Sequence, residues 1–373
     1  MTFHTPVLSQ VPGQDAAMAF LDSAAVRPHH AYVLAGPEGS GKSLAARAFA
    51  AALLCHQGGC GECRDCRLAL KDHHPNEFLV EPEGRDIHVD TIREEVWHPA
   101  SRTAPEPGRK VFVLREADRL SPAAADTLLK VLEEPPADAI FLLMSARAHE
   151  LPETVLSRCH LVTFTALSEA FVVDALTGEG VDGVKAALAA RLTGGNMGRA
   201  RRMAVTQDGL AFREAGRDAI ELATQGPAGG LAAAGVVMDA AKGYKELLDQ
   251  DKERDLAPFR DEKGQDEPAY RGAIRKINDR YKRKERRAER DYVDWVLLAV
   301  SALLRDRIAL SVGISPPELM NPDLAPGDLM GVTRAAHGLA TIEAARAELA
   351  EDFNLNVRLV LERAFLTLAD VAA

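Results

Sequence analysis

The octapeptide GPEGSGKS narrows the possible folds more than any other segment of this 373-residue chain. It matches the phosphate-binding pattern G-x-x-x-x-G-K-[ST], follows the apolar run AYVLA and opens a helical stretch, which is the context that the pattern requires. Backbone N–H groups of such a loop surround phosphate oxygens, while the lysine reaches the β and γ phosphates and the hydroxyl helps to hold Mg²⁺. We therefore expect an α/β nucleotide-binding fold that binds ATP or ADP with Mg²⁺ through Gly36, Pro37, Glu38, Gly39, Ser40, Gly41, Lys42 and Ser43.

The order of apolar and helical segments predicts how the rest of the chain is built. From about residue 30 to 165, short runs such as KVFVLRE and AIFLLMSA alternate with helical stretches such as SLAARAFAAALL. This alternation predicts a parallel sheet with crossover helices. Later residues contain no convincing strand. We expect an α/β domain at 1–165, a small helical lid at 166–207 and an all-helical domain at 208–373.

Two helices have clear sequence signatures. The first begins near Ser121, a capping residue, has Pro122 at its first position and ends before Pro135. The other is the last apolar segment of the chain, LNVRLVLERAFLTLAD. The spacing of its apolar residues predicts one buried helical face, formed by Val357, Val360, Leu361, Phe365 and Leu368.

Composition and charge exclude several other classes of protein. Apolar residues make up 47% of the chain and charged residues 27%, close to ordinary globular usage. No apolar run approaches the roughly 20 residues that span a bilayer, and the N-terminal segment lacks the pattern of a secretory signal. We therefore expect a soluble, cytoplasmic protein with no membrane partner. The net charge of -10 argues against a globally basic surface but leaves room for a local one.

Four of the five cysteines lie in the short segment CHQGGCGECRDC. In a reducing compartment this crowding indicates a metal site rather than disulfides, and four thiolates complete a tetrahedral zinc shell with no open position. Free surface thiols and an iron–sulfur cluster are the alternatives. We interpret His56, His73 and His74 as ordinary surface histidines. The sequence therefore predicts a structural Zn²⁺ bound by Cys55, Cys60, Cys63 and Cys66.

The run VFVLREAD is where a hydrolytic site of this class has its second set of residues. Such a site usually ends this strand in an aspartate, often followed by a glutamate, which hold Mg²⁺ and position water. Here Arg115, a cation, stands at the aspartate position, and Glu116 stands at the glutamate position. Asp118 could replace the missing aspartate only if the register slips. We expect nucleotide binding without much turnover, with efficient hydrolysis at this chain's own site as the alternative.

The segment LPETVLSRC precedes the apolar run HLVTF near the end of the α/β region. Its arginine, Arg158, lies at the far end of a phosphate-loop domain, where an arginine could reach a neighbouring subunit's γ phosphate and stabilise charge there. The alternative is a surface arginine in a local ion pair. We predict the first role, a catalytic arginine finger that acts in trans.

Residues 242–290 are highly charged, and their second part, RGAIRKINDRYKRKERRAERD, is strongly basic. A sparse apolar stripe in this part favours a solvated helix that projects from the helical domain. The alternative is that residues 271–290 contact DNA phosphates, in which case binding weakens steeply with salt because bound cations release counterions. The candidate side chains for that contact are Arg275, Lys276, Arg280, Lys282 and Arg283.

These motifs, in this order, resemble the AAA+ clamp-loader subunits of bacterial DNA polymerase III. VPGQDAAMAFLDSA followed by HHAYVLAGPEGSGKS is similar to the family's adenine-side segment and phosphate loop. The cysteine insertion, LSPAAADTLLKVLEEPP and LPETVLSRC resemble its zinc module, the helix after its second strand and its arginine-finger motif. The tail containing NLNVRLVLERAF resembles its helical collar domain. Arg115 favours the delta-prime branch of the family over the motor subunits.

The resemblance implies an AAA+ domain followed by a helical lid and a helical collar through which subunits oligomerise. It also implies roles for three residues near the nucleotide. Glu116 falls in the acidic pair of the second strand, and Ser145 lies near the polar sensor position. Arg199 is the candidate for the sensor arginine of the lid, although alignment with motor subunits puts Gly198 at that place.

The resemblance further implies partners and a function. The implied complex is a hetero-pentamer with motor (gamma/tau) and delta subunits, associated with the nucleoid, that loads the sliding clamp onto primer–template DNA during replication. In it Arg158 would face a neighbour's ATP, and polymerase activity would belong to the holoenzyme. The alternatives are an ATP-hydrolysing motor subunit of the gamma/tau type and a stand-alone AAA+ DNA-binding ATPase.

Overall fold

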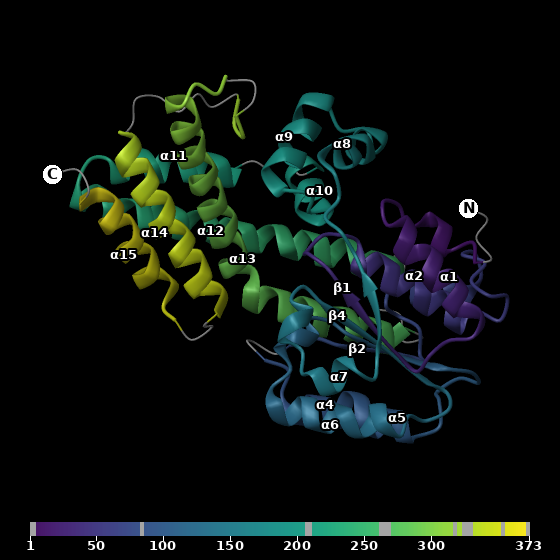
Figure 1. Ribbon diagram of the computed structural model, residues 1–373. Coiled ribbons are helices and arrows are strands. Elements are labelled where there is room, and N and C mark those ends of the chain that lie inside the picture. The colour runs from purple at the N-terminus through teal and green to yellow at the C-terminus, as the bar shows by residue number, and fades with distance from the viewer. Residues whose placement is uncertain are drawn as a thin grey trace. The chain divides into compact units, whose positions relative to one another are not determined.

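The computed structural model describes residues 5–82, 86–205, 211–260, 270–315, 319–322, 331–351 and 355–370. The chain forms two compact units. The first comprises residues 1–175 and 193–199, and the second comprises 176–192 and 200–373. All strands of the described residues belong to the first unit, and Figure 1 labels many of its elements.

The first unit is built on a five-stranded sheet in which every neighbouring pair is parallel. The strand order is β2-β3-β4-β1-β5. In the central pairs, Ala35 lies opposite Ser145 and Thr163, so the carboxyl ends of three strands meet at one edge. The strand bounds are β1 Ala31–Ala35, β2 Glu77–Val80, β3 Lys110–Leu114, β4 Ala139–Ser145 and β5 His160–Thr163.

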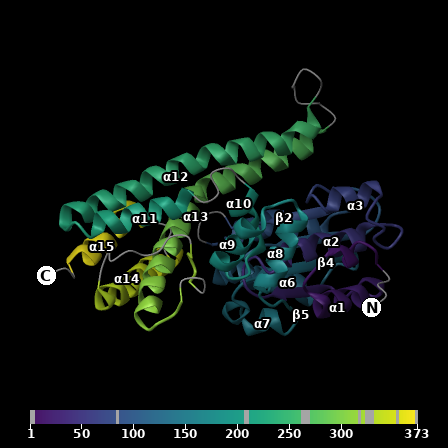
Figure 2. The same cartoon turned by 90° about the horizontal axis from the view of Figure 1, so that it is seen from above.

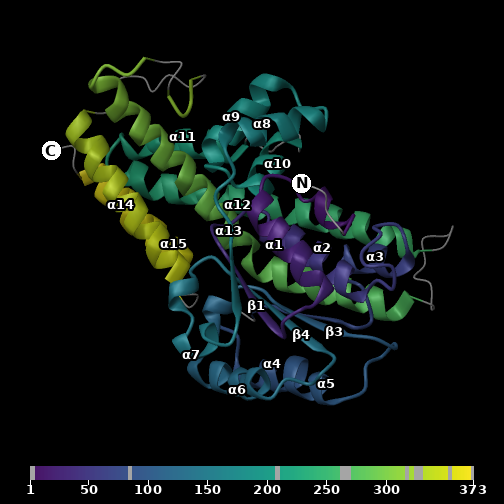
Figure 3. The same ribbon diagram turned by 45° about the vertical axis from the view of Figure 1, so that its right-hand side comes forward.

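Helices cover both faces of this sheet, as Figure 3 shows. Alternate side chains of β1 serve the two faces: Tyr32 and Leu34 pack in one core, whereas Ala31 and Val33 pack in the other. Burial of each large apolar side chain contributes roughly 1.5–3 kcal/mol. The first core includes α1 Asp15–Val26, α2 Lys42–Leu54 and α3 Arg64–Ala69, and the second includes α4 Val89–Ile92, α5 His98–Ser101, α6 Pro122–Glu133 and α7 Glu153–Leu156.

Helix α6 has the boundaries that its sequence predicts. Ser121 is its N-cap residue, and the Ser121 hydroxyl accepts the Ala124 N–H at 3.3 Å. Pro122 occupies the first turn, where its missing N–H costs no helical hydrogen bond. The helix ends at Glu133, shortly before Pro135. Its boundaries therefore follow from local sequence alone.

The second unit contains only helices among its described residues. Helices α12 and α13 pack side by side, as seen in Figure 2. The last helix buries the face predicted for it, formed by Val357, Val360, Leu361, Phe365 and Leu368. The helical bounds are α8 Glu169–Gly178, α9 Gly183–Thr193, α10 Met197–Val205, α11 Ala211–Ala223, α12 Pro227–Leu256, α13 Arg271–Ser311, α14 Val332–Glu351 and α15 Val357–Asp370, of which α8 and α10 begin in the first unit.

The predicted fold class, a parallel α/β region followed by helical segments, is confirmed. In the described part of the chain, none of the helices combines the length and the apolar character needed to cross a bilayer.

Candidate nucleotide and metal sites

The phosphate-loop sequence forms a tight loop between β1 and α2. After Ala35 the chain turns through Gly36, Gly39 and Gly41, whose φ angles of 153°, 73° and 97° favour glycine. A Cβ atom on Gly36 would lie 2.3 Å from the Phe164 carbonyl oxygen. Gly41 is the N-cap of α2, so the first N–H groups of that helix face the loop. The backbone is therefore that of an anion-binding turn.

Lys42 lies across its own loop. Its Nζ donates to the carbonyl oxygens of Gly36 and Pro37, the latter at 2.7 Å. Burial lowers the pKa of Lys42, while the carboxylates of Glu38 and Asp118 oppose that shift. A phosphate that entered the loop would exchange these carbonyl contacts for stronger charge-assisted hydrogen bonds.

Gln14 fastens the loop to the segment that follows β5. Its Nε2 donates to the carbonyl oxygens of Ser40 and Thr165, at 3.0 and 2.8 Å, and its Oε1 accepts the Thr165 N–H. Ser40 is buried, whereas Ser43 in the first turn of α2 is exposed. The contribution of Gln14 was not predicted, and the only signal for it was the resemblance of VPGQD to an adenine-side segment.

Residues 193–199 of the first unit lie over the loop. Asn196 is so close that a Cβ atom on Gly39 would lie 2.1 Å from the Asn196 Oδ1. The Arg199 guanidinium pairs with the Glu38 carboxylate at 3.3 Å. Arg199, selected from sequence, is thus close to the loop, whereas Asn196 carried no sequence signal.

Ser145 and Asp118 meet where strands β4 and β3 end. Ser145, the last residue of β4, is buried and donates its hydroxyl to the Asp118 carboxylate at 2.7 Å. Glu116 has a left-handed backbone, with φ of 50°, and pairs instead with Arg119 at 2.9 Å. The structure therefore brings Asp118, and not Glu116, into contact with Ser145.

The Arg115 guanidinium, just after β3, is bound by two carboxylates. It donates to Glu81 Oε1 at 2.6 Å and to Asp72 Oδ2 at 2.8 Å. The Asp72 carboxylate is buried and also accepts two hydrogen bonds from Arg47 of α2. Burial acts to lower the pKa of Arg115, but these carboxylates raise it overall. A fixed cation thus occupies the place where a hydrolytic site has a metal-binding acid.

The donors at the end of β3 do not fit the acidic arrangement that holds Mg²⁺. This ion requires oxygen ligands in a near-octahedral shell. Arg115 supplies positive charge, Glu116 is paired with Arg119, and Asp118 already accepts hydrogen bonds from Ser145 and from a backbone N–H. The geometry supports nucleotide binding by the glycine-rich loop better than it supports hydrolysis.

The predicted zinc ligands converge between the end of α2 and the start of α3. Their sulfur atoms all lie within 4.8 Å of one another, and three pairs are separated by 3.6, 3.8 and 3.9 Å. A tetrahedral ion with Zn–S bonds of about 2.3 Å requires sulfur–sulfur edges of about 3.8 Å. The set that fits Zn²⁺ is therefore Cys55, Cys60, Cys63 and Cys66.

Backbone N–H groups point at these sulfurs and favour their thiolate forms. The N–H of Gln57 donates to Cys55 at 3.3 Å, and that of Gly61 donates to Cys66 at 3.3 Å. Burial acts to raise the pKa of Cys55, but the backbone donors bring it down to about 6. Burial raises the pKa of Cys66. A cation at the centre would stabilise all of the thiolates together.

A second polar cluster lies beside the cysteines. His74 is 3% exposed, so its prediction as a surface histidine is wrong. Its Nδ1 accepts the Asn76 N–H at 3.1 Å, which leaves the proton on Nε2, 3.6 Å from the Asp65 carboxylate. Glu106 belongs to the same cluster and accepts two hydrogen bonds from Arg64. Because of these partners, we interpret the cluster as a hydrogen-bonded network rather than a second metal site.

Arg158 lies at the sheet edge opposite the phosphate loop. The loop follows the carboxyl end of β1, whereas Arg158 precedes β5, which runs parallel to β1. The two edges are about 15 Å apart because β1 has five residues. The partly exposed guanidinium pairs with Glu133 at 2.6 Å and donates to the Thr154 carbonyl at 2.8 Å. The side chain is therefore remote from this chain's own loop.

The basic segment lies in the long helix α13. Ile274, Ile277 and Tyr281 are buried together, which accounts for the apolar stripe. Arg275 is exposed and lies 3.8 Å from Asp279. Of the remaining candidates for DNA contact, Lys282 is exposed. The side chains of Lys276, Arg280 and Arg283 lie outside the described residues.

Residues 14–168 match the family model described as DNA polymerase III, delta subunit. Over these residues the chain is therefore similar to that family. The DNA polymerase III subunit delta' of Pseudomonas aeruginosa is 43% identical over 136 residues, which are 35% of this chain and 41% of the relative. The subunit delta' of Bacillus subtilis is 34% identical over 173 residues, or 45% of this chain and 51% of the relative.

The DNA polymerase III subunit tau of Bacillus subtilis is 31% identical over 180 residues, 46% of this chain and 31% of the relative. The resemblance to DNA polymerase III delta' subunits that the motifs indicated is confirmed. The chain spans about half the length, or less, of these curated relatives. The matched part of the chain ends just after β5, so the similarity to the family lies in the α/β region.

Proposed function

We propose that this chain is a delta-prime-type subunit of a replicative clamp loader, which binds nucleotide and supplies Arg158 in trans to a neighbouring motor subunit. The observation that carries this proposal is the location of Arg158. The side chain is partly exposed at the sheet edge opposite its own phosphate loop. An arginine there can stabilise phosphate charge only in another molecule.

The proposed nucleotide is ATP or ADP, bound by the loop from Gly36 to Ser43. The glycine turn and the helix N-terminus supply backbone donors, and Lys42 lies within the loop. Arg199 and the pair of Ser145 and Asp118 flank the site. Because Arg115 is held by Asp72 and Glu81, we propose that this chain hydrolyses ATP weakly or not at all.

The proposed partners are motor (gamma/tau) and delta subunits in a hetero-pentamer, with the sliding clamp and primer–template DNA engaged through the complex. Residues 166–207 would act as the lid and 208–373 as the oligomerising collar, in a cytoplasmic, nucleoid-associated assembly. Two supports are the delta' and tau relatives and the helical character of the second unit.

A reconstituted loader tests the proposal directly. Arg158→Ala should lower the DNA-stimulated ATPase rate by about tenfold or more, since arginine fingers contribute large factors to phosphoryl transfer. The matched control is Arg93→Ala, which removes another exposed, ion-paired arginine of the first unit and should leave the rate unchanged. An Arg158→Ala loader that assembles and hydrolyses ATP at the parent rate would contradict the finger role.

The second candidate function is an ATP-hydrolysing motor, and the intact GPEGSGKS loop favours it. Purified chain that turns over ATP near 1 per second, within the ordinary range of enzymes, would support the motor. The delta-prime proposal requires the isolated chain to hydrolyse ATP much more slowly than this. It also requires that a loader containing Lys42→Ala lose its activity only in part.

A further inference from the structure

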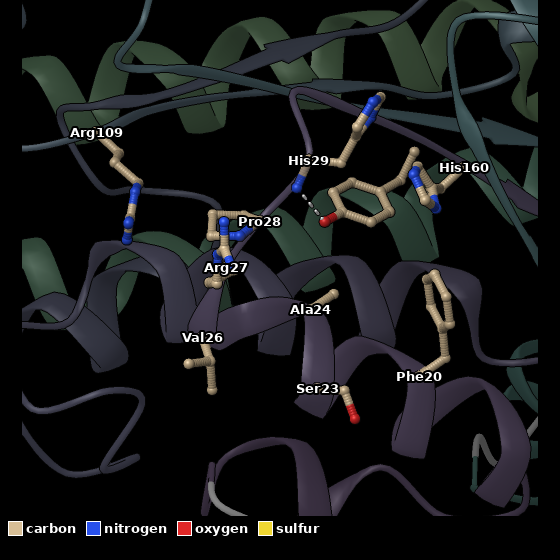
Figure 4. Close-up of a pocket in the computed structure, with 10 residues that line it drawn as sticks. Phe20, Ser23, Ala24, Val26, Arg27, Pro28, His29, Arg109 and His160 are labelled. Atoms are coloured by element: carbon tan, nitrogen blue, oxygen red, sulfur yellow. Dashed lines mark hydrogen bonds between the residues drawn. The ribbon is translucent and has the colours of Figure 1, made fainter.

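A cavity of about 660 Å³ opens at the sheet edge opposite the phosphate loop. It lies between the C-terminal end of α1 and the N-terminal ends of β1 and β5, and Figure 4 shows its walls. Its volume is in the range of sites that hold small organic ligands. The lining residues are Phe20, Ser23, Ala24, Val26, Arg27, Pro28, His29, Tyr32, Arg109 and His160.

One side of the cavity is cationic. Arg27, the residue directly after α1, and Arg109, which precedes β3, lie on the same side in Figure 4. Both residues are exposed. No carboxylate is among the residues that line the cavity. Two guanidinium groups with no carboxylate in the same wall favour the binding of an anion. The planar arrangement of their N–H donors matches the oxygens of a phosphate.

The other side is aromatic. Phe20 is 41% exposed, unusual for a ring of this size, and its centroid lies 6.0 Å from that of His160 at a tilt of 33°. The His160 ring lies 4.3 Å from the His29 ring. Tyr32 is buried behind them and its hydroxyl accepts the His29 N–H at 2.7 Å, which fixes the backbone of this wall. Such exposed ring faces can stack on a flat heterocycle.

We propose that this cavity is a second nucleotide site, which binds a nucleoside monophosphate group with its phosphate between Arg27 and Arg109 and its base on Phe20 and His160. The group comes either from a free mononucleotide or from one nucleotide of a single-stranded nucleic acid, since both carry the same base and phosphate. This site is distinct from the phosphate loop, because β1 separates the two edges of the sheet.

The test uses the full chain with Lys42→Ala, so that the phosphate loop contributes little to binding, and omits magnesium. One arm titrates fluorescent AMP, and the other titrates a short labelled oligodeoxyadenylate, so that both probes carry the same base. We expect saturable AMP binding that weakens about tenfold or more in Arg27→Glu and in Arg109→Glu, because each variant replaces a charge-assisted contact with repulsion. Arg102→Glu, the same charge change outside the cavity lining, should bind like the parent.

Variants of Phe20 distinguish stacking of the base on the ring from simple burial of apolar surface. Phe20→Ala should weaken both probes, and Phe20→Leu should not restore binding although it keeps apolar volume. If only the oligonucleotide binds in a cavity-dependent way, the physiological source is nucleic acid, and if AMP binds in that way more tightly than the oligonucleotide, it is a free mononucleotide. Absence of saturable binding of either probe up to about 1 mM, or affinities equal in Arg27→Glu, Arg109→Glu and Arg102→Glu, would overturn the proposal. Thermal unfolding of each variant verifies that it is folded.

Discussion

At the scale of single residues, Arg115 is the residue that most clearly distinguishes this nucleotide site from a hydrolytic one. Its removal in Arg115→Ala would take from Asp72 and Glu81 the cation that they share, while Asp72 keeps its hydrogen bonds from Arg47. Breaking a buried pair costs about 3–5 kcal/mol, and partial exposure of Glu81 reduces this, so we expect a loss of about 2–3 kcal/mol in the free energy of unfolding. Chemical denaturation measures the loss. Arg93→Ala, which breaks an exposed pair, should cost less than about 1 kcal/mol, and equal losses would contradict this account.

Gly39 and Gly41 test the contact between the loop and Asn196. Both glycines have positive φ angles, so alanine at either position adds backbone strain of about 1 kcal/mol. Only at Gly39 does the added Cβ meet Asn196, whereas at Gly41 it meets nothing within 4 Å. Denaturation should therefore show Gly39→Ala to be less stable than Gly41→Ala by a further 1–3 kcal/mol, roughly the cost of overpacking. In an Asn196→Gly background the cost of Gly39→Ala should shrink without vanishing, because the backbone Cα of residue 196 still lies 2.6 Å from the added Cβ. A cost that is the same with Asn196 and with Asn196→Gly would contradict the steric explanation.

At the scale of elements, the cysteine module joins the end of α2 to the start of α3. Because metal binding energy in such a module is folding energy, Cys63→Ser should lose the metal and several kcal/mol of stability. Elemental analysis should find one zinc per parent chain and little in the variant. Cys159→Ser is the matched control, since this thiol lies outside the cluster and its pKa is raised to about 12 by burial. Stoichiometric iron in the parent would exclude the zinc assignment. So would a parent that remains as stable after its metal has been removed.

The elements that could be predicted from sequence are those with local signals. The loop at Gly36 follows a strand and opens a helix, Ser121 and Pro122 start α6, and apolar spacing defines the buried face of α15. Each signal lies within a few residues of its effect, so no tertiary information is needed. The cysteine cluster was predictable for the same reason.

The parts of the site that could not be predicted depend on long-range contacts. Arg115 and Asp72 are 43 positions apart, and Ser145 and Asp118 are 27 apart. No local pattern specifies which carboxylate an arginine or a serine will meet once strands have been ordered in a sheet. The burial of His74 carried no local signal either, and in the fold it lies close to Glu106, which is 32 positions further along the chain.

At the scale of the whole molecule, the sheet separates two candidate sites at opposite edges. The carboxyl ends of the strands hold the phosphate loop, and the amino ends hold Arg158 and the aromatic cavity. If nucleotide bound at the phosphate loop is not hydrolysed efficiently, this subunit would keep one conformation while a neighbouring subunit hydrolyses ATP. This division predicts that nucleotide affinity in this chain differs from that of a motor in its dependence on magnesium.

Equilibrium binding of ATP to the purified chain, with and without magnesium, measures that dependence. We expect the two dissociation constants to agree within about tenfold, or 1.4 kcal/mol, because Arg115, held by Asp72 and Glu81, occupies the place where a motor has an acid that holds the ion. Lys42→Ala should abolish binding in both conditions, since Lys42 is the cation within the loop itself. A loss much greater than tenfold on omission of magnesium would mean that Asp118 or Glu116 leaves its present partner to hold the ion, and the chain would then have to be regarded as a motor.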